Sequence, residues 1–191
     1  MRPPAGSVVD PAAVPPEPWR NGGGTTRTLW TEPGTGSDFA WRVSLADIAA
    51  NGPFSVFPGV DRALLGVSGA QVTLLIADRT VRVRPRQPVA FDGGSSVAVR
   101  RGFGSRGRPS RVLNMMTARA ECAGGIGVVS ARGAVRWDDE VHAVVLLHGL
   151  LTVAGEAVPP LGLARLRPGE ATGVATKALV AEIRVRPAEA R

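Results

Sequence analysis

Short runs of apolar and β-branched residues, separated by Gly or Pro about every eight to twelve residues, make up the chain from Thr25 onward. No segment sustains helical periodicity for three turns, whereas residues 39–45 alternate large apolar side chains with small or polar ones. This spacing predicts an all-β fold, either a sandwich or a barrel. We expect one helical turn over 46–50 and further strands over 63–67, 71–76, 80–84, 88–91, 96–100, 111–117, 141–147, 150–154, 161–166 and 178–185.

Two similar halves can be recognised within the 191 residues. Segment 67–74 is echoed by segment 147–154, with Gly69 and Gly149 eighty residues apart, about the length of one small barrel. The first half holds most of the Trp, Arg, Asn and Phe side chains, so we expect the functional site there. These observations predict a duplicated jelly roll with an extended arm over 1–18, a first barrel over 19–120 and a second over 121–191, with strands able to swap between the halves.

The chain is strongly basic, with a net charge of +7 and a pI near 11.4. Lys177 is its only lysine, and the arginines are spread over strand-like segments rather than gathered in a tail. A nucleic-acid-associated regulator stays open as an alternative, and its affinity would fall steeply with salt. The arginines that would serve it lie in a Gly/Ser-rich stretch: Arg100, Arg101, Arg106, Arg108 and Arg111.

The number of cysteines and the hydropathy of the chain indicate its cellular location. Cys122 is the only cysteine, which fits a reducing environment, and no run of about 18 apolar residues is present. We therefore expect a cytoplasmic protein with no membrane partner. A homodimer formed by strand pairing stays open, because no feature of the sequence demands or excludes it.

Side chains suited to metal or acid–base chemistry are few. His142 and His148 are the only histidines, and on one strand they would lie about 20 Å apart at roughly 3.3 Å per residue, too far for one metal ion. Cys122 lies in an Ala/Gly segment that we expect to be a loop. We expect no metal, no other cofactor and no catalytic residue, and a binding protein rather than an enzyme. A metal-independent isomerase or hydrolase acting on a small acid through Asp61, Glu121 or a histidine stays open.

Two arginines give the clearest indication of a ligand. The period-two pattern puts Arg42 on the same strand face as Ser44, and a guanidinium presents a planar fork of donors that matches a carboxylate. With Arg62 and the Asn114 amide, these groups would suit a small acid with two polar ends. The competing interpretation makes Arg42 a surface residue and pairs Arg62 with an acid such as Asp61. Apolar walls could come from Phe54, Phe57, Trp41 or Met116.

A run of three glycines lies near the N-terminus, in the sequence Trp19-Arg20-Asn21-Gly22-Gly23-Gly24-Thr25-Thr26. Glycine tolerates positive φ and close backbone approach. The run is either a tight turn that starts the first strand or a ligand-facing segment whose N–H groups could bind an anion. It lacks the G-x-x-x-x-G-K-[ST] pattern and the lysine of a phosphate-binding loop.

Five motifs occur in a fixed order over about a hundred residues: Trp19 to Thr25, Trp41 to Ser44, Phe54 to Arg62, Phe91 to Gly93, and Asn114 to Met116. In this order they resemble the HutD/Ves family of bacterial proteins, which have a cupin-type double barrel. The resemblance implies a non-enzymatic modulator of histidine utilisation that binds a small carboxylate metabolite such as urocanate or an N-formyl or N-formimino glutamate. The chain departs from the family pattern at Val112 and Gly94, where acidic residues are common.

From the residues and the resemblance together, we predict one ligand-binding set in the first barrel. Its members are Trp19, Asn21, Gly22, Gly23, Gly24, Thr25, Arg42, Ser44, Phe57, Arg62, Asn114 and Met116.

Overall fold

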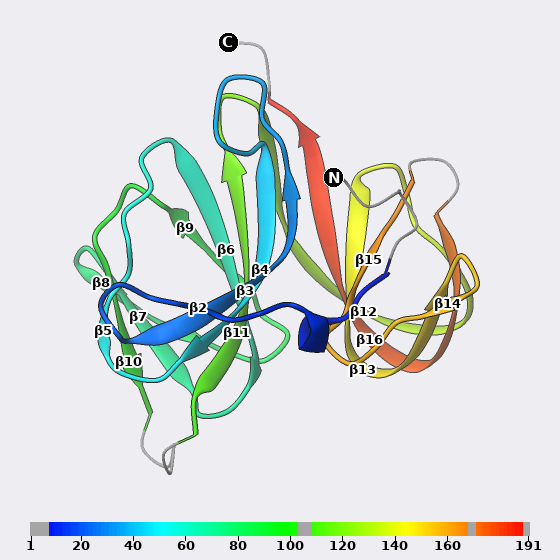
Figure 1. Ribbon diagram of the computed structural model, residues 1–191, viewed down its shortest axis with the longest axis horizontal. Helices are drawn as coiled ribbons and strands as arrows, with labels where there is room; N and C mark the ends of the chain where they lie inside the picture. Colours follow the sequence, from blue (N-terminus) through cyan, green and yellow to red (C-terminus); the bar gives the residue numbers. More distant parts are fainter. Residues whose placement is uncertain (1–7, 103–107, 168–170, 189–191) are drawn as a thin grey trace. The chain divides into compact units, whose positions relative to one another are not determined.

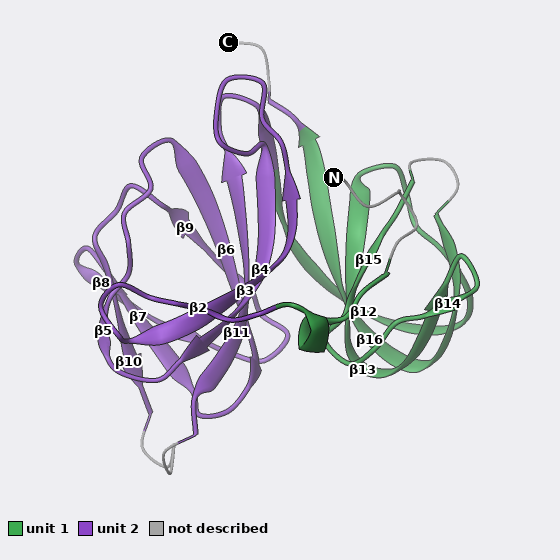
Figure 2. Cartoon of the chain, viewed as in Figure 1, with its two compact units in different colours: residues 1–14, 124–186 green, residues 15–123, 187–191 purple. Residues whose placement is uncertain are grey.

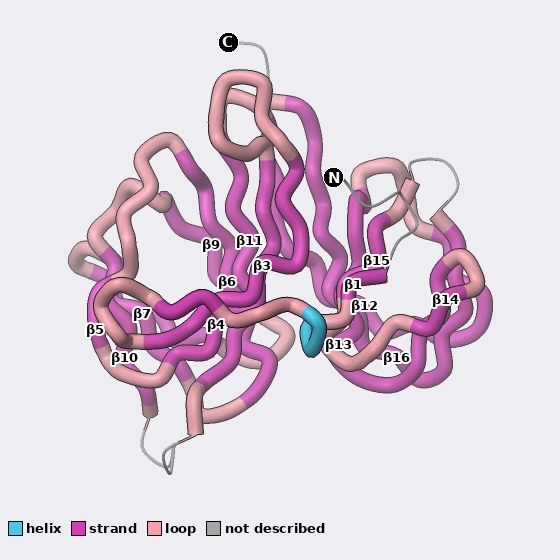
Figure 3. The backbone as a smooth tube through the Cα atoms, in the orientation of Figure 1, coloured by secondary structure: helices cyan, strands magenta, loops and turns pink. Residues whose placement is uncertain are grey.

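The computed structural model describes residues 8–102, 108–167 and 171–188, and its regular structure is almost entirely strand (Figure 3). The all-β prediction is therefore confirmed. None of the helical residues in the described part of the chain forms a helix long and apolar enough to cross a membrane. The elements are β1 (Val8–Val9), η1 (Pro11–Ala13), β2 (Glu17–Pro18), β3 (Gly24–Glu32), β4 (Trp41–Ile48), β5 (Gly52–Pro53), β6 (Val60–Ser68), β7 (Val72–Ile76), β8 (Arg79–Val83), β9 (Val89–Asp92), β10 (Val97–Arg101), β11 (Ser110–Ala118), β12 (Cys122–Arg136), β13 (Val141–Val153), β14 (Glu156–Ala157), β15 (Leu163–Arg165) and β16 (Thr172–Pro187).

The chain divides into two compact units (Figure 2). We call the unit of residues 15–123 with 187–191 the first barrel, and the unit of residues 1–14 with 124–186 the second barrel. The sequence analysis places the boundary at 120/121, whereas the contacts divide the chain at 123/124. Over residues 8–18, the described part of the expected arm, β1 pairs with β15 of the second barrel and β2 pairs with β3 of the first.

The first barrel consists of two sheets that share one core (Figure 1). Over the described residues, a six-stranded sheet has the order β2-β3-β4-β11-β6-β9 and a four-stranded sheet the order β5-β10-β7-β8. Apolar side chains of both sheets form a single buried cluster that includes Leu64, Val112, Leu74 and Val99. Burial of this cluster fixes which strand faces point inward, because side chains alternate between the two faces of a strand.

The second barrel has a sheet of order β1-β15-β13-β16-β12, with β14 added to β13. Its core includes Val144, Leu146, Val180 and Trp137. β13 runs through the two segments that the sequence analysis predicts as separate strands, 141–147 and 150–154, with a register shift at Gly149.

Two sequence predictions about secondary structure are wrong. The helical turn expected over 46–50 is absent, because β4 continues to Ile48 and Ala46 lies between Thr26 and Val112 in the ladder. The segment around Cys122 is not a loop but the start of the long strand β12. Its Gly and Ala residues have low β propensity, yet they form a strand because β12 pairs with β16 in the sheet of the second barrel.

The two glycines of the internal echo hold the same place in the two barrels. Gly69 and Gly149 both have positive φ, +88° and +84°. A Cβ on Gly69 would lie 2.8 Å from the Cα of Ser110, and one on Gly149 would lie 2.8 Å from the Cα of Ala178. In both barrels the glycine therefore lets one strand turn sharply against the backbone of its neighbour. The fold supports the duplication that the echo suggests.

Candidate functional site

One face of the large sheet in the first barrel carries the polar residues of a pocket. The ladder puts Arg42 of β4, Met116 of β11 and Arg62 of β6 in one cross-strand row. The next inward-facing row contains Ser44 and Asn114. Side chains at alternate positions of a strand share a face, so both rows point into the same space, as the period-two pattern predicts for Arg42 and Ser44.

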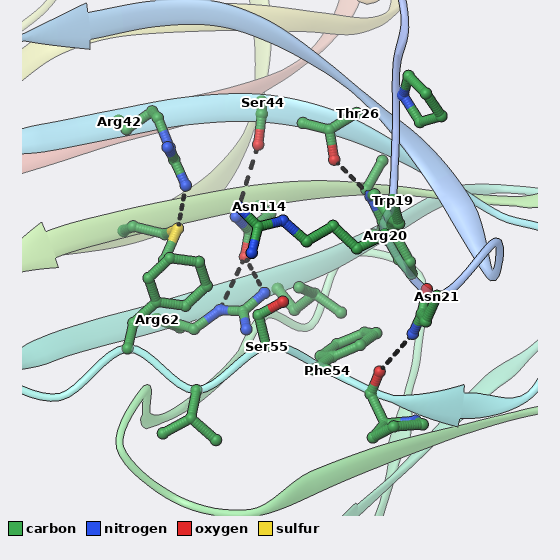
Figure 4. Close-up of a pocket in the computed structure, with 18 residues that line it drawn as sticks. Trp19, Arg20, Asn21, Thr26, Arg42, Ser44, Phe54, Ser55, Arg62 and Asn114 are labelled. Atoms are coloured by element: carbon green, nitrogen blue, oxygen red, sulfur yellow. Dashed lines mark hydrogen bonds between the residues drawn. The ribbon is translucent and has the colours of Figure 1, made fainter.

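Asn114 is the centre of the hydrogen-bond network on this face (Figure 4). Its Oδ1 accepts hydrogen bonds from Nη2 and Nε of Arg62, at 3.0 Å and 3.3 Å. Its Nδ2 lies 3.5 Å from Oγ of Ser44, a long and weak contact. Asn114 and Ser44 are both buried. The amide therefore orients Arg62 while its own donor remains only weakly used.

Arg62 is enclosed by three aromatic rings. Its Cζ lies 5.1 Å from the ring centroids of Phe54 and Phe91 and 5.8 Å from that of Phe57. Burial and, to a smaller extent, the nearby charge of Arg42 together lower the pKa of Arg62 to about 10. The guanidinium is still cationic at neutral pH, but it has lost most of its water and is paired with no carboxylate in the described part of the chain.

Arg42 is held in a similar way on the other side of Met116. Its Nη2 lies 3.1 Å from the Met116 sulfur, and its Cζ is 5.0 Å from the ring centroid of Phe39 and 5.9 Å from that of Phe57. Burial lowers the pKa of Arg42, and the charge of Glu17 opposes this shift. Its Nε is buried without a hydrogen-bond partner among the described residues. An unpartnered buried donor of this kind suits an acceptor brought by a ligand.

Two loops close the sides of the pocket. Trp19 donates a hydrogen bond from Nε1 to Thr26 Oγ1 at 2.8 Å and contacts Phe54 edge to face at 5.8 Å. Asn21 donates from Nδ2 to the carbonyl of Pro53 at 3.1 Å. The residues before the glycine run are thus joined both to β3 and to the segment that follows β5. The open cavity between them has a volume of about 680 Å³, enough for a small metabolite.

The charges of the lining are all positive. Arg20, Arg42 and Arg62 line the cavity, and none of its described lining residues is Asp, Glu, His, Cys or Lys. Val112 contributes an apolar side chain to the lining. The lining can donate several hydrogen bonds to an anion and surround an apolar chain. It offers no side chain that exchanges a proton near neutral pH.

Several arginines outside the cavity are paired with carboxylates. Arg111 binds Asp47 through two hydrogen bonds of 2.6 Å and 2.7 Å. Arg119 binds Asp61 at 2.8 Å and also contacts Asp92. The interpretation that pairs Arg62 with Asp61 is therefore wrong, because Asp61 points to Arg119 on the opposite strand face.

Eight of the twelve predicted residues line the cavity: Trp19, Asn21, Arg42, Ser44, Phe57, Arg62, Asn114 and Met116. Phe54, proposed as a wall, also lines it, whereas Trp41 does not. Trp41 faces the other way and stacks on Trp30, with ring centroids 6.5 Å apart.

The glycine run does not line the cavity, contrary to the prediction for Gly22, Gly23, Gly24 and Thr25. The N–H groups of Gly22 and Gly23 are used inside the turn, by the carbonyl of Trp19 and by Oδ1 of Asn21. A Cβ on Gly24 would lie 3.2 Å from the Trp19 ring. The glycines therefore allow the turn and the packing of Trp19, and their amides are not available to an anion.

The sequence analysis misses several lining residues, among them Arg20, Thr26, Ser55 and Val56. Arg20 and Thr26 belong to the run around the glycines, and Ser55 and Val56 belong to the motif that ends at Arg62. Both motifs were recognised, but sequence alone does not say which of their members face the cavity. A signal for Thr26 was present in the sequence. Thr26 lies two residues after Gly24, and residues two apart on a strand share a face.

The groups proposed for acid–base chemistry lie outside the cavity. Glu121 accepts hydrogen bonds from the amides of Thr35 and Gly36 and from the Ser37 hydroxyl, which lowers its pKa to about 2. Cys122 is buried, lies 3.1 Å from the carbonyl of Ala40, and has its pKa raised to about 11 by burial. His142 and His148 are on β13 in the second barrel. In the described residues no group of three or more His, Cys, Asp or Glu side chains could hold a metal ion.

The arginine-rich stretch is partly occupied with internal contacts. Arg111 pairs with Asp47, and Arg101 donates to the carbonyls of Ala49 and Arg108. Arg106 lies outside the described residues, and Arg100 and Arg108 are exposed.

Comparison with known proteins gives a family and a fold. The sequence model of the HutD family matches residues 12–183. Protein Ves of Citrobacter koseri is 41% identical over 110 residues, so the matched part spans 57% of this chain and only 56% of that relative. The fold is similar to that of HutD from Pseudomonas fluorescens SBW25, determined in a formate condition, with a TM-score of 0.77, 26% identity and coverage of 95% of this chain and 98% of that one.

Two more distant structures share the fold alone. A conserved protein of unknown function from Pseudomonas aeruginosa PAO1 has a TM-score of 0.76 at 22% identity, covering 94% of this chain and 97% of its own. YlbA from E. coli has a TM-score of 0.71 at 11% identity, covering 94% and 90%. The cupin-like double barrel expected from the motifs is confirmed.

Proposed function

The chain belongs to the HutD family, and we propose that its first barrel binds a small carboxylate metabolite and that this binding modulates histidine utilisation. One observation carries the proposal: Arg42 and Arg62 are largely desolvated in one cavity and have no carboxylate partner among the described residues. A bound carboxylate would accept from these guanidiniums and from Asn114 Nδ2, and would relieve the cost of burying two positive charges close together.

The lining supports binding rather than catalysis. A proton-transfer mechanism needs a titratable side chain within hydrogen-bond reach of the substrate. The described lining has none that titrates near neutral pH, and Asp61 and Glu121 are occupied with Arg119 and with the turn at 35–37. A small acid held there would be recognised and released unchanged, as a sensor of metabolite level requires.

The first test is a thermal-stability screen with urocanate, N-formylglutamate, N-formiminoglutamate, histidine and glutamate. A ligand at 100 times its Kd stabilises the folded state by about 2.7 kcal/mol, which for a chain of this size raises Tm by about 5 °C or more. We expect a shift with at least one of the acids, and we expect it to be absent in the Arg42→Ala, Arg62→Ala double variant. An Arg79→Ala variant serves as the control, since Arg79 is an exposed arginine of the same barrel outside the cavity.

The regulatory part of the proposal needs a cellular measurement. The chain is introduced into a bacterium that grows on histidine and lacks its own HutD, and intracellular urocanate and growth rate are followed. We expect the wild-type chain to restore both, and the double variant to fail at equal expression. Restoration by the double variant would contradict a role for the pocket in regulation.

A further inference from the structure

A third arginine enters the same cavity from the loop before the glycine run. Arg20 lines the cavity, and its side chain extends into it from the loop (Figure 4). We propose that Arg20 is a specificity-determining residue that binds a second carboxylate, so that the pocket selects dicarboxylates over monocarboxylates. This inference rests on the function proposed above and adds the chemical class of its ligand.

The loop fixes the backbone of Arg20 on both sides. Trp19 is held by its hydrogen bond to Thr26 and by its ring contact with Phe54, and Asn21 is held by its hydrogen bond to Pro53. The amide of Gly22 donates back to the carbonyl of Trp19, which closes the turn around Arg20. Its two neighbours are thus anchored to different walls, and Arg20 is left between them with its head directed to the cavity.

The Arg20 guanidinium itself is not used by the protein. It forms no hydrogen bond or ion pair with another described residue, and it is exposed at the mouth of the cavity. Arg111, Arg119 and Arg184, in contrast, each bind at least one carboxylate. An arginine that is positioned by its neighbours and yet unpaired is available to a ligand.

The charge balance of the cavity favours a dianion. Three guanidiniums line it, and no carboxylate is among its described lining residues. The acid whose charge acts on Arg42 is Glu17, which is exposed. A monoanion bound by Arg62 and Arg42 would leave Arg20 without an ion pair. A second carboxylate on the ligand would form that ion pair, while the carbon chain between the two carboxylates contacts Phe54, Phe57 and Leu64.

The test is a calorimetric comparison of two five-carbon acids, glutarate with two carboxylates and valerate with one. We expect the wild-type protein to bind glutarate about fivefold more tightly than valerate, since an ion pair with an exposed arginine is weakened by the surrounding water. In Arg20→Gln the preference should disappear through loss of glutarate affinity, with valerate binding changed by less than about twofold. Arg20→Lys should restore part of the preference, because it keeps the charge but not the planar fork.

Arg79→Gln removes the same charge from the surface of the barrel and should leave both affinities unchanged. Equal binding of the two acids by the wild-type protein, or an unchanged preference in Arg20→Gln, would overturn the role of Arg20 while leaving the carboxylate site intact. Failure of both acids to bind would overturn the proposed function and this inference with it. Loss of valerate binding in Arg20→Gln would also overturn the inference, because it would place Arg20 in the primary site.

Discussion

The two barrels place different charges at matching points of the same kind of sheet. Leu64 pairs with Asn114 in the first barrel, and Val144, eighty residues later, pairs with Glu182 in the second. Asn114 is neutral and contacts Arg62, which has no carboxylate partner in the described residues. Glu182 is an acid and accepts a hydrogen bond from Arg184 at 3.1 Å.

Arg184 is neutralised by the second barrel itself. It also bonds Asp138 at 2.8 Å and Glu140 at 3.3 Å, and these acids raise its pKa. Burial without an acid lowers the pKa of Arg62 instead. Both barrels contain a partly or fully buried arginine, and the difference is whether carboxylates lie beside it. The candidate site therefore arises because the arginines of the first barrel's cavity lack carboxylate neighbours in the described residues. A duplicated framework can therefore carry a ligand site in one copy and an internal ion-pair network in the other.

The largest effect on stability is expected at the two glycines that hold equivalent positions in the two barrels. Gly69→Ala and Gly149→Ala should each lower the free energy of unfolding by about 3 kcal/mol, because each combines positive φ with a Cβ placed against the backbone of the next strand. Urea unfolding followed by tryptophan fluorescence measures both. Gly125→Ala is the control, since its Cβ would meet nothing within 4 Å. A cost below about 1 kcal/mol at only one glycine would show that the two positions are not equivalent.

The next prediction compares how much Arg184 and Arg62 contribute to stability. Arg184→Met should destabilise the protein by about 2 kcal/mol, because it leaves Glu182 and two further acids without their partner. Arg62→Met should change the stability of the ligand-free protein by less than about 1 kcal/mol, because it removes a desolvated charge that has no carboxylate partner. The same unfolding assay compares them. Equal destabilisation by the two substitutions would contradict the distinction between a paired and a ligand-ready arginine.

A smaller effect on stability at acid pH is expected for two carboxylates, Glu121 and Asp138, which have different hydrogen-bond partners. Neutral N–H and O–H donors lower the pKa of Glu121 to about 2, whereas a hydrogen bond and charge from Arg184 lower that of Asp138. Each carboxylate has its folded-state pKa depressed, so each contributes stability above its unfolded pKa of about 4, and that stability is lost as the pH falls toward the folded value. Glu121→Gln and Asp138→Asn should therefore both flatten the loss of stability between about pH 4.5 and 2.

Salt separates the two carboxylates further. High salt should reduce the effect of Asp138→Asn, which removes an ion pair at the surface, more than that of Glu121→Gln. Acid unfolding at low and high sodium chloride measures this difference. Equal salt sensitivity of the two variants would argue that both carboxylates are held mainly by charge.

The smallest effect on stability concerns the loop before the glycine run, which lines the pocket of the first barrel. Asn21→Ala removes the hydrogen bonds to Pro53 and Gly23 and should cost about 1 kcal/mol or less in stability, since both are exposed or partly exposed. Affinity for a dicarboxylate such as glutarate should fall a few-fold because Arg20 loses one of its two anchors. Calorimetry and urea unfolding on the same variant separate these effects. Unchanged affinity would show that Trp19 alone holds the loop.

Local pattern was sufficient for much of the fold and part of the site. The two-residue period of 39–45 placed Arg42 and Ser44 on one face, and the echo of Gly69 in Gly149 indicated the duplication. The prediction of a loop around Cys122 was wrong. The Gly and Ala residues of β12 have no strand preference of their own, and they form a strand because they pair with β16. The prediction of a helical turn over 46–50 was also wrong, because the backbone of Ala46 is bonded on both sides by neighbouring strands.

The all-β class, the two-barrel organisation and the set of polar side chains from which a carboxylate site can be built are all predictable from the sequence. These follow from periodicity, turn residues and residue chemistry, which are local properties. Only the tertiary structure decided that Asp61 pairs with Arg119 and leaves Arg62 to Asn114, that the glycine run shapes a turn instead of binding an anion, and that Arg20 faces the cavity. Such outcomes depend on which strands become neighbours and in what register, and the free energy of that arrangement is shared by residues far apart in the chain.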